Sequence, residues 1–417
     1  MNTRVGLFAV LMGLTCGYDA TAMAGALLQV TDHFGLTTTG QGSLYSATAA
    51  GWIAGALLGS RLVTAIGRRT TLLVLIALYL AGTGLAVTAG GLVWLDAGRF
   101  VQGTAIGMAI VATPVFIAES ASTRARGRIA VLYQVATSLG CALGYFGGYV
   151  LADSGQWRLM LAIPGALAVA TAVRLLPLPE TDRWRNLRGE PRPTGVLRSL
   201  IGPRHRRLTL FVVALGFFVQ ATGINAMVFF SPRIFQHMGF TDTFGLLVLP
   251  GLVQLAGAVA ALACALTVDR FGRRPALLTG TALMALGHAL MVVVFAADSP
   301  GVVGFAGLVV FVVGFNSGFG ALVWVFAAEG YPDRLRGAGA SAMLLTNLTT
   351  NLVVAQFFLD LLNAVGGAGT YLLLLGVTAL AWLFVFFLAP ETKGRSLDEV
   401  QAHWEVTAGR SVRRPVR

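Results

Sequence analysis

Pro179-Glu180-Thr181 closes a long apolar stretch of the chain, and the same three residues return 211 positions later as Pro390-Glu391-Thr392. Two further pieces recur in the same order: Gly67-Arg68-Arg69 returns as Gly272-Arg273-Arg274 after 205 positions, and Glu119 with Arg126 returns as Glu329 with Arg336 after 210. One such match can arise by chance. Three in the same order, at nearly constant offset, indicate two homologous halves arranged as a parallel repeat.

The composition around these motifs is that of a membrane protein. Of the 417 residues, 56% are hydrophobic and 12% are charged, about half the charged share of a soluble domain, which excludes a water-soluble enzyme. Twelve crossings of roughly 20 residues would use about 240 residues. Apolar runs of this length predict twelve helices, at residues 5–30, 43–66, 71–92, 95–118, 128–151, 157–177, 208–231, 244–268, 275–297, 301–328, 337–362 and 369–389.

The basic residues predict how these helices are oriented. With both termini in the cytoplasm, 27 of the 30 arginines and lysines fall on or near the inner side, and only Arg158 and Arg233 fall on external connections. This asymmetry follows the positive-inside rule, so the net charge of +12 requires no nucleic-acid partner. The start of the chain also resembles a signal peptide, with a cleavage site at Ala22-Met23-Ala24, but cleavage would leave eleven spans and break the repeat.

We therefore expect an all-α protein of the cell membrane, made of two six-helix halves. The predicted parts are an N-terminal half at residues 1–177, a cytoplasmic central loop at 178–207, a C-terminal half at 208–389 and a cytoplasmic tail at 390–417. The cysteines Cys16, Cys141 and Cys264 lie far apart without metal-ligand spacing, and the sequence has no nucleotide-binding loop, so no cofactor, metal or disulfide is expected. We expect a monomer in the lipid bilayer.

Among the charged residues inside predicted spans, Asp19 and Arg99 are of particular interest because they lie at similar depth in the outer half of the membrane. Asp19 lies about 14 residues into the first helix, roughly 20 Å from its inner end, and Arg99 lies about 4 residues into the fourth, which runs the other way. A charge within a span costs about 2.5–3.5 kcal/mol, so intramembrane ions are normally paired and functional. A carboxylate that can take up a proton, opposite an arginine that stays charged, suits a proton switch; a purely structural pair is the alternative.

Amide side chains in the otherwise apolar spans suggest a substrate site, because each offers a donor and an acceptor to a hydroxyl group. Asn347 and Asn351 are four residues apart and so share one helix face. Between Gln220 and Asn225, Thr222-Gly223 can break the helix and turn both amides inward. Gln134 is a further candidate amide. Amide contacts between helices remain the alternative interpretation.

Together, the motifs resemble those of the major facilitator superfamily, and more narrowly of its sugar porter family, over nearly the whole chain. The matching segments are Gly17-Tyr18-Asp19, Gly98-Arg99-Phe100, Pro114 to Glu119, Arg126-Gly127, Trp157-Arg158-Leu159-Met160, Pro179 to Trp184, Gln220 to Asn225, Asp269 to Arg274 and Pro390 to Arg395. The resemblance implies that Asp19 is the proton site, since facilitative members usually carry a neutral residue there. It also aligns Gln134, Gln220, Asn225, Trp324 and Asn347 with the family's sugar ligands.

The resemblance further implies a cytoplasmic gate, in which acidic helix ends of one half meet arginines of the other and latch an outward-facing state. The matching residues are Glu119, Arg126, Glu180, Arg183, Asp269, Arg273, Glu329, Arg336 and Glu391. Alternatively, the arginines only obey the positive-inside rule. Where the family usually has an acidic-basic pair before Gly67, this chain has Thr64-Ala65, which predicts a weaker N-terminal latch unless Arg61 compensates.

The substrate site also departs from the family pattern. Members that bind hexoses tightly often differ at five positions: they have a second glutamine at Val219, a tyrosine at Phe229, an asparagine near Gly257, an acid at Asn316 and a tryptophan at Leu348. A site with fewer polar groups satisfies fewer hydroxyls. The substrate is then a pentose, a polyol or a less polar solute.

The sequence thus predicts a secondary active transporter, a proton-coupled symporter of a sugar or polyol that works by alternating access. The alternatives are a proton-coupled efflux antiporter for a less polar molecule and a facilitative uniporter. A nutrient sensor would normally add a long cytoplasmic domain, and only 27 residues follow Pro390. A membrane enzyme is not expected, because no Ser/His/Asp group, metal cluster or paired catalytic carboxylates can be identified.

Overall fold

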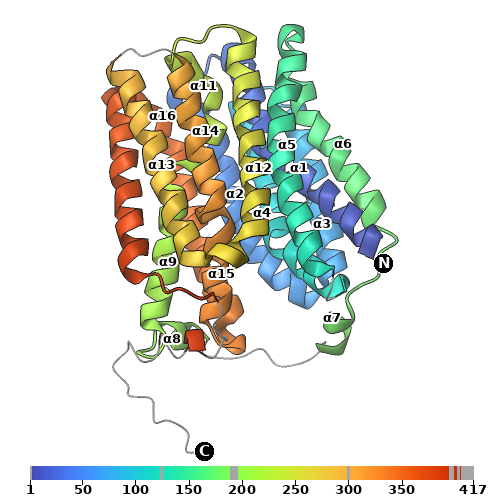
Figure 1. Cartoon of the computed structure of the whole chain (residues 1–417). Helices are drawn as coiled ribbons and strands as arrows, with labels where there is room; N and C mark the ends of the chain where they lie inside the picture. Colours follow the sequence, from blue (N-terminus) through green and yellow to red (C-terminus); the bar gives the residue numbers. More distant parts are fainter. Residues whose placement is uncertain are drawn as a thin grey trace, which may run out of the picture.

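The computed structural model describes residues 2–122, 125–187, 196–297, 301–393, 399–401 and 404. The regular structure of these residues is helical, and the long helices run side by side through the molecule (Figure 1). The short helices α7 (Asp182–Leu187) and α8 (Val196–Ile201) lie at one end, which we call the inner end; the opposite end is the outer end.

Six long helices form the N-terminal half. They are α1 (Asn2–Phe34), α2 (Thr38–Ala65), α3 (Arg68–Val87), α4 (Leu92–Ser120), α5 (Arg126–Leu151) and α6 (Trp157–Leu175). A 3-10 turn, η1 (Ala152–Ser154), follows α5. These bounds agree with the first six predicted spans to within five residues at either end.

The C-terminal half contains six further spans, several of them interrupted. The seventh comprises α9 (Arg206–Ala221), α10 (Ile224–Phe229) and α11 (Ser231–His237); the eighth, the π turn η2 (Phe244–Val248) and α12 (Leu249–Phe271); the ninth, α13 (Arg273–Ala296); the tenth, α14 (Gly301–Ser317) and α15 (Phe319–Gly330). Helix α16 (Asp333–Leu388) contains the last two spans, which meet at Gly366, where φ is 71°. The break at Gly366 confirms the predicted boundary between the eleventh and twelfth helices.

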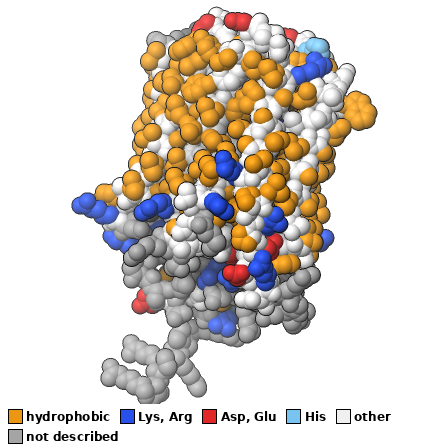
Figure 2. All heavy atoms as spheres, turned by 90° about the vertical axis from the view of Figure 1, so that its right-hand side faces the viewer, with side chains coloured by type: hydrophobic (Ala, Val, Ile, Leu, Met, Phe, Trp, Pro, Cys, Tyr) orange, Lys and Arg blue, Asp and Glu red, His pale blue; other side chains and the backbone are white. Residues whose placement is uncertain are grey.

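Ten helices of the described part of the chain are long and apolar enough to cross a membrane. Helix α16 counts once among these ten although it contains two spans, and α2 is not among them because glycine, serine and threonine occupy much of its length. With these two corrections the predicted number of twelve holds. Figure 2 shows hydrophobic side chains over most of one face of the molecule, with lysines and arginines gathered toward the inner end.

Glycines let the helices of the N-terminal half pack backbone against backbone. A Cβ atom at Gly17 of α1 would lie 1.9 Å from the carbonyl oxygen of Thr137 on α5. One at Gly55 of α2 would lie 2.0 Å from that of Thr104 on α4. Such close crossings are typical of small residues in membrane helices, and here they fix α1 and α4, the helices that carry the two intramembrane charges.

Candidate transport site

Asp19 and Arg99 form an ion pair in the middle of the N-terminal half. Arg99 Nη1 lies 3.0 Å from Asp19 Oδ1, and each residue is only 1% exposed. The sequence placed both charges at similar depth on different helices, and the structure brings them together. Because both charges are fully removed from solvent, each needs the other: an unpaired ion at this depth would destabilise the fold by several kcal/mol.

Three neutral side chains complete the surroundings of this ion pair. The Tyr79 hydroxyl donates to Asp19 Oδ1 at 2.8 Å, Arg99 Nε donates to Thr48 Oγ1 at 3.1 Å, and Arg99 Nη1 also donates to Gln102 Oε1 at 3.0 Å. We did not predict these three partners. Gln102 follows Arg99 by three residues and so shares its helix face, which could have been recognised, whereas Tyr79 and Thr48 come from other helices.

A cavity of about 270 Å³ lies between the halves, toward the inner end. Its lining comes from α5, α12, α14 and α15: Ala130, Val131, Gln134, Val135, Ala261, Ala265, Asn316, Gly320 and Trp324. Two of the five predicted substrate residues are thus on the cavity wall. Trp324 is 40% exposed and Gln134 is also exposed, so neither side chain is enclosed by other protein atoms.

The other predicted substrate residues take part in amide pairs between the seventh span and α16, which carries Asn347. Gln220 Nε2 donates to Asn347 Oδ1 at 3.2 Å, and Asn225 Nδ2 donates to Asn351 Oδ1 at 2.8 Å. They do not line the cavity in this conformation. These amide contacts between helices are the alternative interpretation considered above, and they leave the Asn351 Nδ2 donor buried without a partner in the described residues.

The predicted break in the seventh span is present and makes this pairing possible. Helix α9 ends at Ala221, Gly223 adopts φ 88°, and α10 begins at Ile224. Only glycine adopts such a φ without strain. The break rotates the second segment so that Gln220 and Asn225, five positions apart, both face α16. His288 Nε2 contacts the Thr222 carbonyl at 3.2 Å beside this break.

A second break in the same span joins the two halves at the outer end. Pro232 lacks an amide proton, so the carbonyl of Val228, four residues earlier, has no helical donor. The hydroxyl of Tyr145 donates to this carbonyl, and that of Tyr45 donates to the neighbouring Phe229 carbonyl at 2.7 Å. Both tyrosines belong to the N-terminal half, so the halves are bonded directly through α10.

Polar contacts surround these tyrosines at the outer end. The Ser46 hydroxyl donates to Gln356 Oε1 at 2.6 Å, and that of Thr38 donates to Asp360 Oδ1 at 2.8 Å. Arg233 Nε donates to Gln41 Oε1 at 3.0 Å. All three join α2 to the C-terminal half. The outer ends of the halves are therefore in contact, while the cavity lies toward the inner end.

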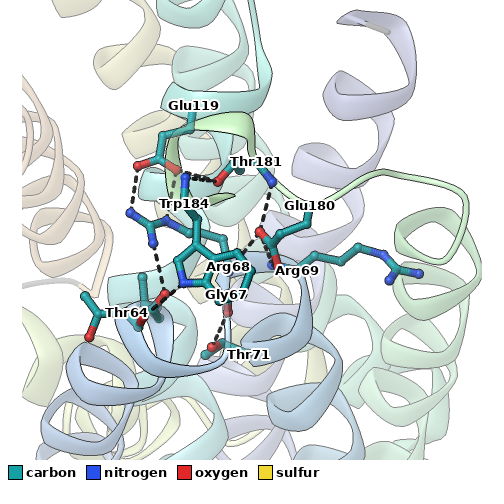
Figure 3. Close-up of polar contacts among 10 residues, drawn as sticks. Thr64, Gly67, Arg68, Arg69, Thr71, Glu119, Glu180, Thr181 and Trp184 are labelled. Atoms are coloured by element: carbon teal, nitrogen blue, oxygen red, sulfur yellow. Dashed lines mark hydrogen bonds and ion pairs between the residues drawn. The ribbon is translucent and has the colours of Figure 1, made fainter. Parts of the chain in front are cut away.

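The repeated motifs of the N-terminal half form one network at the inner end (Figure 3). Arg68 Nε lies 2.9 Å from Glu119 Oε2, and the Thr181 hydroxyl donates to the same oxygen at 2.7 Å. Glu180 accepts from the backbone amides of Arg68 and Arg69, both at 3.0 Å. Glu119 and Glu180 thus make these contacts within their own half, and Arg68, which our prediction omitted, is the partner of Glu119.

Thr64-Ala65, which stand where the family usually has an acidic-basic pair, are held by a different contact. The Trp184 indole, on α7, donates to the Thr64 carbonyl at 2.9 Å. Arg61, the residue considered as compensation, is exposed, as is Arg183 of the predicted gate. The side chains of Arg126, Asp269 and Glu329 lie outside the described residues, so the predicted latch between the halves stays a prediction.

The C-terminal half repeats the carboxylate arrangement. Glu391 accepts from the backbone amides of Arg273 and Arg274, each at 3.1 Å, and from that of Lys393 at 2.8 Å. Partial burial raises the pKa of Glu391. The backbone amide donors of Lys393, Arg273, Arg274 and Thr392 together lower the pKa by more than burial raises it, so it lies below its ordinary value.

The fold and the buried ion pair define the class: a twelve-helix secondary carrier of the major facilitator type. The sequence matches the family model described as "Sugar (and other) transporter" over residues 5–193 and 190–404. The chain belongs to this family of sugar transporters.

Individual relatives agree with this assignment. The chain is 30% identical to the arabinose-proton symporter of Escherichia coli K12, over 99% of this chain and 95% of that protein. It is 29% identical to a probable polyol transporter of Arabidopsis thaliana, over 96% and 93%. Its fold matches the inward open xylose transporter of E. coli with a TM-score of 0.84 and 24% identity, over 97% of this chain and 100% of that one.

Proposed function

We propose that the chain is a proton-coupled symporter that moves a monosaccharide or polyol across the cell membrane by alternating access. The observation that carries this proposal is the buried ion pair of Asp19 and Arg99. A carrier that only equilibrates its substrate needs no titratable group inside the membrane, where an ion is costly. The similarity to an arabinose-proton symporter and to a polyol transporter supports both the coupling and the class of substrate.

The ion pair supplies the coupling because a carboxylate has two charge states and an arginine has one. Ionised Asp19 binds Arg99, and protonated Asp19 releases most of that attraction. The two states favour different arrangements of α1 and α4, and a ligand shifts a conformational equilibrium by its difference in affinity for the two states. The proton acts as such a ligand.

Substrate binds between the halves at Gln134 and Trp324, which already face the cavity. Gln220, Asn225 and Asn347 join them when the halves close, exchanging their mutual hydrogen bonds for substrate hydroxyls. Such an exchange replaces one neutral hydrogen bond by another, so its net cost is small. The amide pairs therefore hold the site ready without blocking it.

The conformation described is inward-facing in this proposal. Its support is the contact between Tyr45, Tyr145 and α10 at the outer end, together with the cavity near the inner end. In the outward-facing state the inner ends would close, and the gate residues Glu119, Arg126, Glu180, Arg183, Asp269, Arg273, Glu329, Arg336 and Glu391 would form the latch. The moving parts are residues 1–177 and 208–389. We place both termini in the cytoplasm, take the functional unit to be a monomer in the bilayer, and assign the chain no enzymatic activity.

One observation favours a second candidate, an efflux antiporter for a less polar molecule. Apart from Gln134, Asn316 and Trp324, the cavity is lined by alanine, valine and glycine. Such a wall offers few partners for hydroxyl groups and much apolar contact. The antiporter would also use Asp19. The two candidate functions therefore differ in whether substrate moves in the same direction as the proton or in the opposite direction.

The test is uptake into proteoliposomes that contain the purified protein. Radiolabelled L-arabinose, D-xylose, D-galactose and xylitol are presented in turn, with an imposed gradient that is acidic outside. The proposal expects at least one of them to accumulate above its external concentration, and a protonophore to abolish the accumulation. Equilibration without accumulation would identify a uniporter, and proton-driven movement in the opposite direction would identify the antiporter; either result contradicts the symporter.

A further inference from the structure

The two oxygens of the Asp19 carboxylate have different surroundings. Oδ1 accepts two hydrogen bonds, from Arg99 Nη1 at 3.0 Å and from the Tyr79 hydroxyl at 2.8 Å. Oδ2 is buried and has no donor among the residues that the structure describes. Because Oδ1 already accepts two donors, Oδ2 is the oxygen with free acceptor positions for a proton.

Tyr79 is held firmly in this position. The residue is 2% exposed, on α3. Its backbone carbonyl accepts from the Thr83 hydroxyl at 2.9 Å, Thr83 accepts from Gln102 Nε2 at 3.0 Å, and Gln102 Oε1 accepts from Arg99. Tyr79 and Arg99 are therefore joined twice, once through Asp19 and once through the Gln102 amide. The second route holds the α3 backbone at Tyr79 in place relative to the guanidinium without depending on Asp19, while the phenol itself is bonded to Asp19.

We infer that Tyr79 is a positioning residue for proton coupling: its hydroxyl occupies Asp19 Oδ1 beside Arg99, so that the proton is taken up on Oδ2. This inference rests on the proposed symport. A donor to a carboxylate stabilises the ionised form over the protonated form. Tyr79 thereby sets how acidic the outside must be before the carrier is loaded.

The other groups that face Asp19 do not replace this effect. Arg99 on α4 is the only charged one among the described residues, and it stays charged throughout. Cys16 on α1 and Cys141 on α5 are also close to Asp19, but a thiol is neutral at the pH of transport. The Tyr79 hydroxyl is thus the neutral donor whose removal changes the balance between the two states of the acid while leaving the ion pair.

The test compares Tyr79→Phe with the wild type in proteoliposomes. Pyranine inside the vesicles reports proton entry while L-arabinose, D-xylose, D-galactose and xylitol are added outside in turn, and the compound with the largest wild-type signal is used across a pH series. Loss of one hydrogen bond to a charged group should move the pH of half-maximal uptake upward by about one unit. Counterflow of the same compound should persist.

Tyr371→Phe is the matched control, because Tyr371 is also fully buried in a membrane helix and its hydroxyl has no partner in the described residues. It should keep the wild-type pH profile. Replacement of Tyr79 by 3-fluorotyrosine keeps the hydroxyl and makes it a stronger donor, so it should move the midpoint downward. This second variant tests the inference with opposite sign even if Tyr79→Phe fails to assemble.

Three outcomes would overturn the inference. They are an unchanged midpoint in Tyr79→Phe, a downward shift in that variant, or loss of counterflow together with proton entry, which would make Tyr79 a structural residue. A wild type that admits no protons with any compound of the panel would instead refute the proposed symport, and the two failures are thereby distinguishable.

Discussion

Glu180 and Glu391 occupy equivalent places in the two halves. Glu180 binds the backbone amides of Arg68 and Arg69 at the start of α3, and Glu391 binds those of Arg273 and Arg274 at the start of α13. The first amides of a helix have no intrahelical acceptor and carry partial positive charge. Each carboxylate therefore caps the helix that begins at a Gly-Arg-Arg motif, α3 or α13. The recurrence of Pro-Glu-Thr and Gly-Arg-Arg in the sequence thus has a structural basis.

Gly67 makes room for the first of these caps, and we predict that Gly67→Ala destabilises the protein. Gly67 has φ 98°, and a Cβ atom there would lie 2.3 Å from Glu180 Oε2. The positive φ alone costs about 1 kcal/mol or more for alanine. Thermal unfolding in detergent should show a lower Tm. Gly84→Ala is the control, because Gly84 lies within α3 with nothing within 4 Å of its Cβ position; an equal loss in both variants would contradict the argument.

The second cap predicts a pH dependence of stability. The pKa of Glu391 is lowered in the folded protein, so its contribution is present above the pKa of the unfolded chain and disappears as the pH falls through the folded value. The Tm of the wild type should exceed that of Glu391→Gln at pH 7. This difference should shrink as the pH is lowered below about 4.5. A difference that stays constant with pH would refute the assignment.

The hydrogen bonds of Tyr45 and Tyr145 to α10 hold the outer ends of the two halves together, so we predict that their loss favours the outward-facing state. Tyr45→Phe and Tyr145→Phe each remove a hydrogen bond worth about 0.5–1.5 kcal/mol, so each should raise the outward-facing population about 2- to 10-fold. Spin labels at Thr39 and Asn363, which are exposed on α2 and α16, should report longer distances in both variants. Tyr371→Phe should leave the distance distribution unchanged. A wild-type distribution in all three would show that the hydroxyls do not hold the closure.

The lining of the cavity predicts that the Gln134 amide contributes to substrate binding. Gln134→Ala should weaken binding of the transported sugar about 2- to 10-fold, because it removes a side chain that already faces the cavity. Gln220→Ala and Asn225→Ala should also weaken binding, since each leaves an α16 amide without its partner and removes a proposed substrate ligand. Equilibrium binding to protein in detergent measures this. Normal binding in all three variants would place the site elsewhere.

Asp19→Asn should uncouple transport. Asparagine is close in shape to the protonated acid and cannot release a proton, so concentrative uptake driven by a pH gradient should be lost. Counterflow needs alternating access but no net proton movement, and it should remain measurable. A variant that still accumulates substrate on acidification would leave Asp19 as a structural partner of Arg99.

The sequence predicted those structural features that a single segment of the chain determines by itself. Span positions follow from apolar length, and the break at Gly223 follows from a glycine between two amides. The meeting of Asp19 and Arg99 could be expected from depth alone, because neither charge tolerates the membrane unpaired. Such arguments need no knowledge of which helices are neighbours.

Contacts that depend on neighbouring helices could not be predicted in the same way. Nothing in the α3 sequence indicates that Tyr79 faces Asp19, or in α2 and α5 that Tyr45 and Tyr145 reach α10. Arg68 was missed for a different reason: we expected Glu119 to meet an arginine of the other half, and the nearer arginine of its own half was not considered.

Because Thr48 and Gln102 bind Arg99 independently of Asp19, we expect the guanidinium to stay in place when the acid is neutralised. The ionised pair has no net charge, and the protonated pair carries one positive charge through the N-terminal half. The loaded carrier of the proposed cycle is then electrogenic and the empty carrier is not. A membrane potential of 100 mV, negative inside, would favour inward movement of the loaded form by up to about 2.3 kcal/mol. Transport should therefore respond to voltage even at equal pH on the two sides.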